Sequence, residues 1–364
     1  MANFTIALPS GHPQLQRVTA RWDQLQEFGR YVEQLQKDYL NRDGGVLVRF
    51  PSEVLQDLME GFDKERKKAS DVRVGILQQN FQPVPREENC FHHYVEEVEP
   101  MTLSGYSTYC AQQAYSGRME LHEMKEDYFR RLATFDIGTP GVKYGADQAN
   151  TDLFKCTSVF ELNDVHTIIK GTSLEEVPGL VRKYGYFGCY GSSFAAHVEN
   201  ALLYSANLHM YGWPKLWDVW PASQFEEVAL FCKDHLLGSD LRSHVRKCPF
   251  PMSHKGDIFP SFRVEGGSLG VQCFGDLMIT APAATHMGFN TGENYCEAVN
   301  FGNRFWLSYV KGRMDAGTYP ECSYKHKKNC QSITPTSADF QKWENVEHFD
   351  SILTKRFARG PRNC

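Results

Sequence analysis

Hydrophobic side chains near the start of the chain recur at steps of three and four positions. Within residues 19–40 this spacing holds for Trp22, Leu25, Phe28, Val32 and Leu35. Such a stripe is typical of an amphipathic helix with one buried face. The segment Asn-Arg-Asp-Gly-Gly then breaks the pattern. The run at residues 45–54 predicts a short strand that stops at Pro51, before a second helix.

The next stretch, about residues 70–150, mixes the two periods. An alternation of apolar and polar residues, typical of a strand, occurs in VRVGILQQNFQPV. Helical spacing returns in MTLSGYSTYCAQQAYS and in MELHEMKEDYFRRLATF. We therefore expect a mixed α/β region here.

From about residue 150 to residue 315 the pattern changes again. Short aromatic and β-branched runs are separated by Gly, Pro and Asn, and one helical insert, SQFEEVALFCKDHLL, interrupts them. Many short strands with turns between them are typical of an all-β barrel or a double-sheet jelly roll. The predicted fold class is mainly β with flanking helices (α+β), around a jelly-roll core.

Composition narrows the classes of protein. The 364 residues are 41% hydrophobic and 13% aromatic, enough for a sizeable core, and the net charge is −5. A mildly acidic chain does not favour direct binding to duplex nucleic acid, because phosphate contacts require a basic face. The 11 cysteines show no regular pairing, which favours reduced thiols. We find neither a secretory signal nor an apolar run of the roughly eighteen residues that cross a bilayer, and we expect a soluble intracellular protein.

Candidate chemistry starts at His197 and Glu199. Residues two apart in a strand project to the same face, so these two side chains would both point into the barrel. His286 follows another predicted strand and offers a third ligand. Two histidines and one carboxylate make the facial triad of non-haem iron(II) oxygenases. A His-x-Glu pair alone is more often a hydrogen-bonded or surface pair.

A second signal lies just beyond the first pair. Asn207 and Lys215 are spaced to allow one strand, a turn at Gly-Trp-Pro and the next strand. A buried lysine needs an anionic partner, because an unpaired charge is costly there. A dicarboxylate that chelates iron at its keto-acid end would supply that partner with its far carboxylate. The alternative for Lys215 is a solvated turn residue.

Two longer segments carry a family resemblance. Residues 186–217 and 275–301, which contain FAAHVEN, GWPKLW, APAATHMGFN and EAVNF, resemble the JmjC catalytic domain of 2-oxoglutarate oxygenases. KEDYFRRLATF and YGADQANTDLF resemble the JmjN–JmjC trimethyl-lysine histone demethylases. The resemblance covers about residues 15–310. It implies four parts: a helical JmjN-like element at 15–60, a mixed α/β linker region packing on the core at 61–150, a JmjC jelly roll (a double-stranded β-helix) at 151–315, and a C-terminal helical, zinc-site-like region at 316–364.

The resemblance also implies roles for individual residues. Fe(II) would be held by His197, Glu199 and His286. The cosubstrate 2-oxoglutarate would be bound by Tyr144, Phe194, Asn207, Lys215 and Trp217. The pocket for substrate methyl-lysine would be formed by Gly179, Tyr186, Ala298, Asn300 and Asp147. Ala298 stands where some members have Ser, and other relatives carry Ala there.

The activity implied by the resemblance is N-methyl hydroxylation of lysine in histone H3 tails, with release of formaldehyde. Trimethyl-lysine at positions 9 and 36 of the tail would be the substrate. The implied setting is chromatin in the nucleus, without sequence-specific binding to nucleic acid and without a membrane. A JmjC protein hydroxylase and a catalytically inactive JmjC chromatin scaffold are the alternatives.

A structural zinc site is the last feature that the resemblance implies. The trimethyl-lysine group has a zinc held by Cys and His near the peptide groove. Here Ser239 stands near where the first Cys is expected. A tetrahedral set is chemically available from His244, Cys248, Cys322 and Cys330. Free thiols are an equally good interpretation of the same residues.

Overall fold

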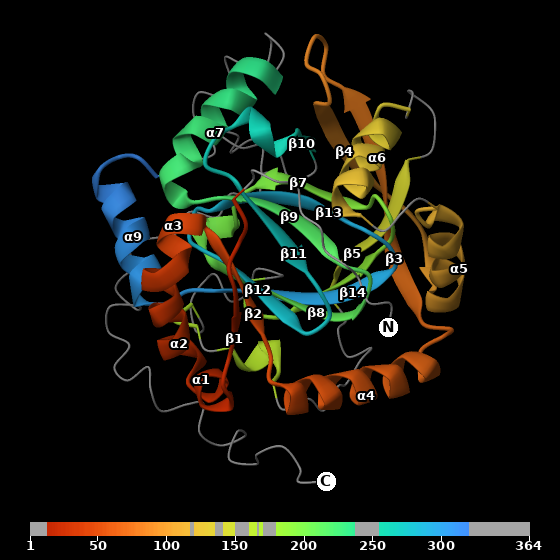
Figure 1. Cartoon of the computed structure of the whole chain (residues 1–364), viewed down its shortest axis with the longest axis horizontal. Coiled ribbons are helices and arrows are strands. Elements are labelled where there is room, and N and C mark those ends of the chain that lie inside the picture. The colour runs from red at the N-terminus through yellow and green to blue at the C-terminus, as the bar shows by residue number, and fades with distance from the viewer. Residues whose placement is uncertain are drawn as a thin grey trace.

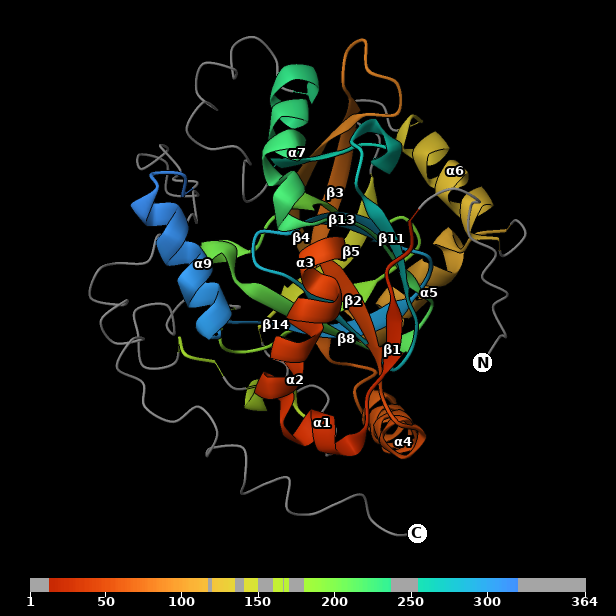
Figure 2. The same cartoon turned by 60° about the vertical axis from the view of Figure 1, so that its left-hand side comes forward.

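Two β-sheets lie at the centre of the fold, and helices surround them (Figure 1). The structure is a computed structural model that describes residues 13–116, 120–134, 141–149, 160–165, 167–169, 180–236 and 255–319. Helices α1 to α3 and α9 lie on one side of the strands, and α5 and α6 lie on the other (Figures 1 and 2).

The larger sheet has ten strands within the described residues. In spatial order they are β1 (Arg17–Thr19), β2 (Gly45–Arg49), β12 (Asp276–Thr280), β8 (Tyr204–Gly212), β14 (Asn294–Phe301), β6 (Tyr184–Gly188), β5 (Val142–Gln148), β3 (Arg73–Pro83), β4 (Phe91–Thr102) and β10 (Lys255–Ile258). The smaller sheet, in the same part of the chain, consists of β11 (Ser268–Gln272), β9 (Lys215–Trp220), β13 (Thr285–Asn290) and β7 (Ser193–His197). The mainly β fold with flanking helices, predicted from the sequence, is confirmed.

The chain passes from one sheet to the other at the turn before Lys215. β8 belongs to the ten-stranded sheet, whereas β9 lies between β11 and β13 in the four-stranded sheet. The predicted strand, Gly-Trp-Pro turn and second strand are therefore confirmed. The turn brings Lys215 from the large sheet to the start of a strand in the small one.

The helices predicted before residue 316 are present, with one correction, whereas the predicted helical region at 316–364 lies, apart from its first residues, outside the described part of the chain. The stretch expected as one helix over residues 19–40 is divided, because the backbone leaves helical geometry at Glu27 and then widens into a π-helical turn. Its pieces are α1 (Trp22–Gln26), α2 (Phe28–Leu35), the π-helical turn Gln36–Leu40 and α3 (Asn41–Asp43). The remaining α-helices in the described residues are α4 (Ser52–Lys68), α5 (Leu103–Gln113), α6 (Leu121–Leu132), α7 (Phe225–Phe231) and α9 (Arg304–Asp315). None of the described helices has the length and apolar character needed to cross a membrane.

The β strands of the N-terminal and middle regions join the same sheet as the later strands. β1 and β2 extend it on one edge, while β3, β4 and β5 extend it on the other. Strand β4 was not predicted, because its run of Glu and a Pro breaks the apolar alternation. It lies near an edge, where one face stays in contact with water.

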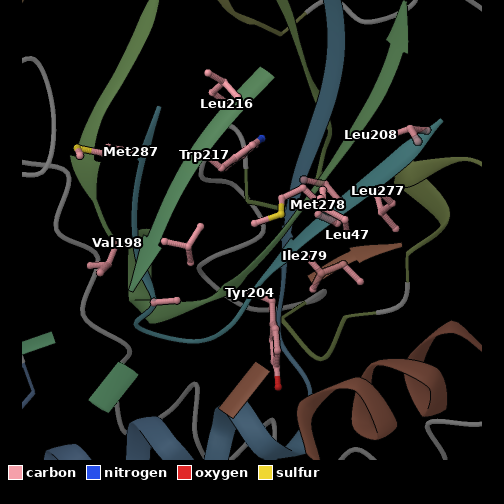
Figure 3. Close-up of a cluster of buried hydrophobic side chains, with 14 of the residues drawn as sticks. Leu47, Val198, Tyr204, Leu208, Leu216, Trp217, Leu277, Met278, Ile279 and Met287 are labelled. Atoms are coloured by element: carbon pink, nitrogen blue, oxygen red, sulfur yellow. The ribbon is translucent and has the colours of Figure 1, made fainter. Parts of the chain in front are cut away.

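A core of apolar side chains fills the space around the sheets. Figure 3 shows part of it, with buried side chains from β2, β8, β9, β12 and β13. Among them are Leu47, Leu208, Trp217, Met278 and Met287. Burying each such side chain stabilises the fold by about 1.5–3 kcal/mol. These contacts fix the strands that carry the polar site described next.

Candidate metal and cosubstrate site

Three potential metal ligands meet at one end of the small sheet. His197 is the last residue of β7, Glu199 lies just past its end, and His286 is directly opposite His197 on β13. One ligand atom of each residue lies within 4.8 Å of the others. Nε2 of His286 is 3.4 Å from Oε1 of Glu199, and the two imidazole centroids are 4.3 Å apart. The predicted triad is therefore brought together.

A glycine beside this cluster allows the strands to approach closely. A Cβ atom at Gly288 would lie 1.9 Å from the carbonyl oxygen of Leu216 on β9. The pairing of β13 with β7 also shifts register between His286 and Gly288. Such an irregularity redirects a side chain at the edge of a site, and here it accompanies the turn of His286 toward Glu199.

Backbone carbonyls set the orientation of both imidazoles. Nδ1 of His197 is 2.7 Å from the carbonyl oxygen of Ala195, and Nδ1 of His286 is 3.0 Å from that of Ala284. A carbonyl can only accept, so each Nδ1 carries a hydrogen, and Nε2 is the ring nitrogen that remains available to a metal. This arrangement is the usual way in which proteins fix a metal-binding histidine.

The electrostatics favour the protonation states that bind a metal. Burial and, to a smaller extent, the charge of His286 lower the pKa of His197 to about 4, against the opposing charge of Glu199. Burial raises the pKa of Glu199, but the hydrogen bond and charge of His286, the charge of His197 and a hydrogen bond from Asn300 outweigh it, and the pKa falls to about 2. At neutral pH the site offers one carboxylate and the neutral His197 imidazole.

This donor set fits an Fe(II) ion. Two imidazole nitrogens and one carboxylate oxygen occupy three positions and leave three for other ligands, as in non-haem iron oxygenases. His197, Glu199 and His286 are the residues that would hold it.

A buried ammonium lies near the triad. Lys215, at the start of β9, is only 2% exposed. Its Nζ is within hydrogen-bonding reach of the hydroxyl of Tyr144 and the thiol of Cys296. Three aromatic rings lie 5.5 to 5.8 Å from Nζ, those of Tyr186, Phe194 and Trp217. Four residues predicted around the cosubstrate thus meet in space.

Two of these rings connect the ammonium to the triad. The ring of Phe194 lies 6.5 Å from that of His286, and the indole of Trp217 lies 5.8 Å from it. The same two rings contact each other at 4.6 Å. A flat ligand that bridges His286 and Lys215 would therefore have aromatic walls.

Lys215 keeps its charge without a carboxylate partner in the described part of the chain. Burial lowers its pKa, but the contacts with Cys296 and Tyr144 raise it above the ordinary value. The second deeply buried lysine, Lys183, differs. Its Nζ lies 2.8 Å from Glu161 and 2.8 Å from Glu297. An ammonium with neutral partners alone is a site for an anionic ligand.

Gln272 is a site residue that the sequence analysis missed. It is fully buried on β11, directly opposite Lys215. Its Nε2 donates to Oδ1 of Asn207 at 3.1 Å, and its Oε1 accepts from the indole N–H of Trp217 at 3.0 Å. The amide oxygen of Asn207 is thereby engaged, which leaves its N–H₂ group for a ligand. The sequence signal that could have identified Gln272 is a polar glutamine at the end of the apolar run Leu-Gly-Val-Gln.

The residues predicted for the methyl-lysine pocket lie on two strands that flank this region. Tyr186 is on β6, and its hydroxyl hydrogen-bonds to Asp147 of β5. Asp147 is exposed and has a φ of 53°, a left-handed conformation that is strained for a residue other than glycine. Ala298 and Asn300 lie on β14, where Asn300 hydrogen-bonds to Glu199 and donates to the carbonyl of Tyr204 at 3.1 Å.

Some predicted residues lie outside the described part of the chain. Gly179 is one of them. So is the whole predicted zinc set, His244, Cys248, Cys322 and Cys330.

Comparisons with known proteins agree with this geometry. Residues 184–301 match the family model described as JmjC domain, hydroxylase. The chain is similar to the human probable lysine-specific demethylase 4F (26% identical over 297 residues, 79% of this chain and 44% of that protein). It is also similar to rat lysine-specific demethylase 4D (27% identical over 301 residues, 79% of this chain and 55% of that protein). With mouse lysine-specific demethylase 4B it is 26% identical over 303 residues, 79% of this chain and 26% of that protein.

The chain spans about half or less of the length of these curated relatives. The family match contains the triad, Lys215, Asn207 and β14, whereas Tyr144 and Asp147 lie before it. The segment that matches the JmjC domain model, residues 184–301, is therefore the part of the chain that holds the triad and the buried ammonium.

Proposed function

We propose that the chain is an Fe(II)- and 2-oxoglutarate-dependent dioxygenase that demethylates methyl-lysine in histone H3 tails. The observation that carries the proposal is Lys215, a buried ammonium without a carboxylate partner among the described residues. The rings of Phe194 and Trp217 lie close both to this ammonium and to the imidazole of His286. A dicarboxylate that binds the metal at one end and Lys215 at the other satisfies both groups. With iron and 2-oxoglutarate bound, the site would supply the oxidation of a substrate C–H bond by dioxygen.

The chain's own residues bind and orient the reactants. Lys215 and the Tyr144 hydroxyl would hold the far carboxylate by charge-assisted hydrogen bonds. The walls of Phe194 and Trp217 would keep the cosubstrate between the sheets and exclude water from it. Asn207, oriented by Gln272, would donate its amide hydrogen beside that carboxylate.

The substrate would enter on the side of Tyr186 and Asp147. The Tyr186 hydroxyl donates its hydrogen to Asp147, so its oxygen lone pairs are available to face a methylated ammonium. Glu199 adds a carboxylate on the metal side, and Asn300 holds that carboxylate. A cation surrounded by oxygen atoms is the arrangement that a trimethyl-lysine requires. We propose trimethyl-lysine at positions 9 and 36 of the H3 tail as substrates, and nuclear chromatin as the setting.

The test is mass spectrometry of methylated H3 peptides incubated with the purified chain, Fe(II), ascorbate and 2-oxoglutarate. We expect losses of one CH₂ unit that require 2-oxoglutarate and disappear in His197→Ala. A persistent gain of one oxygen atom would instead identify a protein hydroxylase, the reaction class that the family description names. No mass change, no succinate and no bound iron would leave a catalytically inactive scaffold.

The zinc site needs a separate test. We propose elemental analysis of the purified chain and of Cys248→Ser. One zinc per chain that is lost in the variant would support a structural site with His244, Cys322 and Cys330. Absence of zinc from both proteins would assign Cys248, Cys322 and Cys330 as free thiols.

A further inference from the structure

Cys296 lies inside the cosubstrate region, yet neither the family match nor the sequence analysis assigns it a role. It is fully buried on β14, and its backbone is paired with Tyr186 of β6 and His209 of β8. The ring of its cross-strand neighbour Tyr186 lies 5.6 Å from Nζ of Lys215, and the thiol interacts electrostatically with that ammonium. A thiol is an uncommon partner for a buried ammonium, because it brings no negative charge.

The position of Cys296 on β14 connects the two ends of the site. Successive side chains of a strand point to opposite faces, so Cys296, Ala298 and Asn300 share one face. At one end of this row Cys296 contacts Lys215, and at the other Asn300 hydrogen-bonds to Glu199. The opposite face of the strand holds Glu297, which is paired with Lys183. The row therefore lines the path from the ammonium to the metal ligands.

The chemistry of the thiol suits this place. Burial raises the pKa of Cys296, although Lys215 opposes the shift, so the group stays a neutral thiol. It therefore leaves the positive charge of Lys215 available for a ligand. Its S–H can donate a weak hydrogen bond to a carboxylate oxygen, its side chain is one heavy atom longer than that of alanine, and its sulfur is larger than the hydroxyl oxygen of serine.

We propose that Cys296 is a specificity-determining residue of the cosubstrate pocket, and this inference rests on the proposed function. The sulfur fills the space beside the Lys215 ammonium and contacts the far carboxylate of the bound dicarboxylate. It thereby limits how far a dicarboxylate can extend beyond the metal, and it selects the five-carbon acid over one that is longer by a methylene.

The experiment measures binding rather than turnover. Isothermal titration of the full chain loaded with Mn(II) gives the Kd of 2-oxoglutarate and of 2-oxoadipate, which is one carbon longer. The variants are Cys296→Ala, which removes the sulfur, and Cys296→Ser, which keeps a smaller donor. Cys110→Ala is the matched control, because Cys110 is a buried thiol on α5 whose Sγ contacts the carbonyl of Gly188 at 3.7 Å and not Lys215.

We expect Cys296→Ala to weaken 2-oxoglutarate binding by about three- to tenfold, the loss of one weak hydrogen bond at a charged site. The same change should tighten 2-oxoadipate binding, so that the selectivity ratio falls by about tenfold or more. Cys296→Ser should keep most of the affinity for 2-oxoglutarate and lose part of the selectivity. Cys110→Ala should leave the ratio unchanged even if it lowers the stability of the chain.

A second measurement does not depend on the variants. Methyl methanethiosulfonate, a small thiol reagent, is applied to the Mn(II)-loaded wild-type chain, and peptide mass spectrometry follows Cys296 and Cys110. Saturating 2-oxoglutarate should slow modification of Cys296 at least severalfold and leave that of Cys110 unchanged.

The outcomes separate the two proposals. If the wild type binds 2-oxoglutarate but the ratio is unchanged in Cys296→Ala and the thiol is not protected, the role of Cys296 is overturned and the proposed function stands. If the wild type does not bind 2-oxoglutarate at all, both fail. A lowered ratio together with protection supports both.

Discussion

Two buried lysines of this chain should respond in opposite ways to the same substitution. Lys215 is 2% exposed and has neutral partners, Tyr144 and Cys296. Lys183 is 5% exposed and lies 2.8 Å from carboxylate oxygens of both Glu161 and Glu297. Methionine has nearly the length of lysine and no charge. We therefore compare Lys215→Met with Lys183→Met in the apo chain.

The magnitudes follow from the partners. Replacing buried charges by apolar groups of similar volume is often neutral or stabilises a protein by about 1–4 kcal/mol. The three rings near Lys215 lie 5.5 to 5.8 Å from Nζ, close to the limit for cation–π attraction. Loss of this attraction in the variant cancels about 0.5–1 kcal/mol of the gain in stability. We expect Lys215→Met to raise the free energy of unfolding by about 1–2 kcal/mol, which for a chain of this length corresponds to a Tm about 1–3 °C higher.

Lys183→Met should do the reverse, because it leaves two carboxylates close together without a counter-ion. Breaking a buried pair costs about 3–5 kcal/mol. The Glu161 side chain is 24% exposed, which places the loss near the lower end of that range. The Tm should fall by about 4 °C or more.

Thermal unfolding of the two variants and the wild type, each with and without Mn(II) and 2-oxoglutarate, measures both effects. A ligand at one hundred times its Kd stabilises the native state by about 2.7 kcal/mol. This shift should occur in the wild type and be lost in Lys215→Met, although that variant is the more stable apo chain. The reasoning is refuted if Lys215→Met destabilises the apo chain as much as Lys183→Met, because Lys215 would then have a counter-ion.

Three further changes test other parts of the site. His286→Ala should weaken Mn(II) binding by more than about 100-fold in calorimetric titration. His93→Ala, at a buried histidine outside the site, should leave Mn(II) binding unchanged. Equal Mn(II) affinities in the two variants would exclude His286 from the metal site. Gln272→Met should weaken 2-oxoglutarate binding by about tenfold through loss of the hydrogen bonds that orient the pocket, and an unchanged Kd would contradict that role. Asp147→Asn keeps a residue type that tolerates the left-handed backbone. Because Asp147 contacts Tyr186, the change should raise the KM for methylated peptide severalfold and leave the Kd of 2-oxoglutarate unchanged. A change in that Kd alone would exclude a role on the substrate side.

The chain's local patterns predicted most of the elements and named most of the residues that meet at the candidate site. Period-two alternation predicted β3, and apolar runs between turns predicted the later strands, because side-chain direction within one strand is fixed by the backbone. The triad His197, Glu199 and His286 could be named since few residue types bind a divalent metal. Lys215 could be named since a lysine in an apolar strand is costly without an anion.

Only the tertiary structure decided which strands pair and which of their side chains meet at the site. Gln272 and Cys296 contact the site through strand pairing between segments far apart in the chain, and local periodicity carries no information about that pairing. The same holds for Lys215 and Lys183. Both are lysines in aromatic-rich strand regions, but the fold places two carboxylates beside Lys183 and a phenol and a thiol beside Lys215. The sequence indicated a lysine near the metal ligands, and the packing of the two sheets decided that it is buried and that its charge remains available to a ligand.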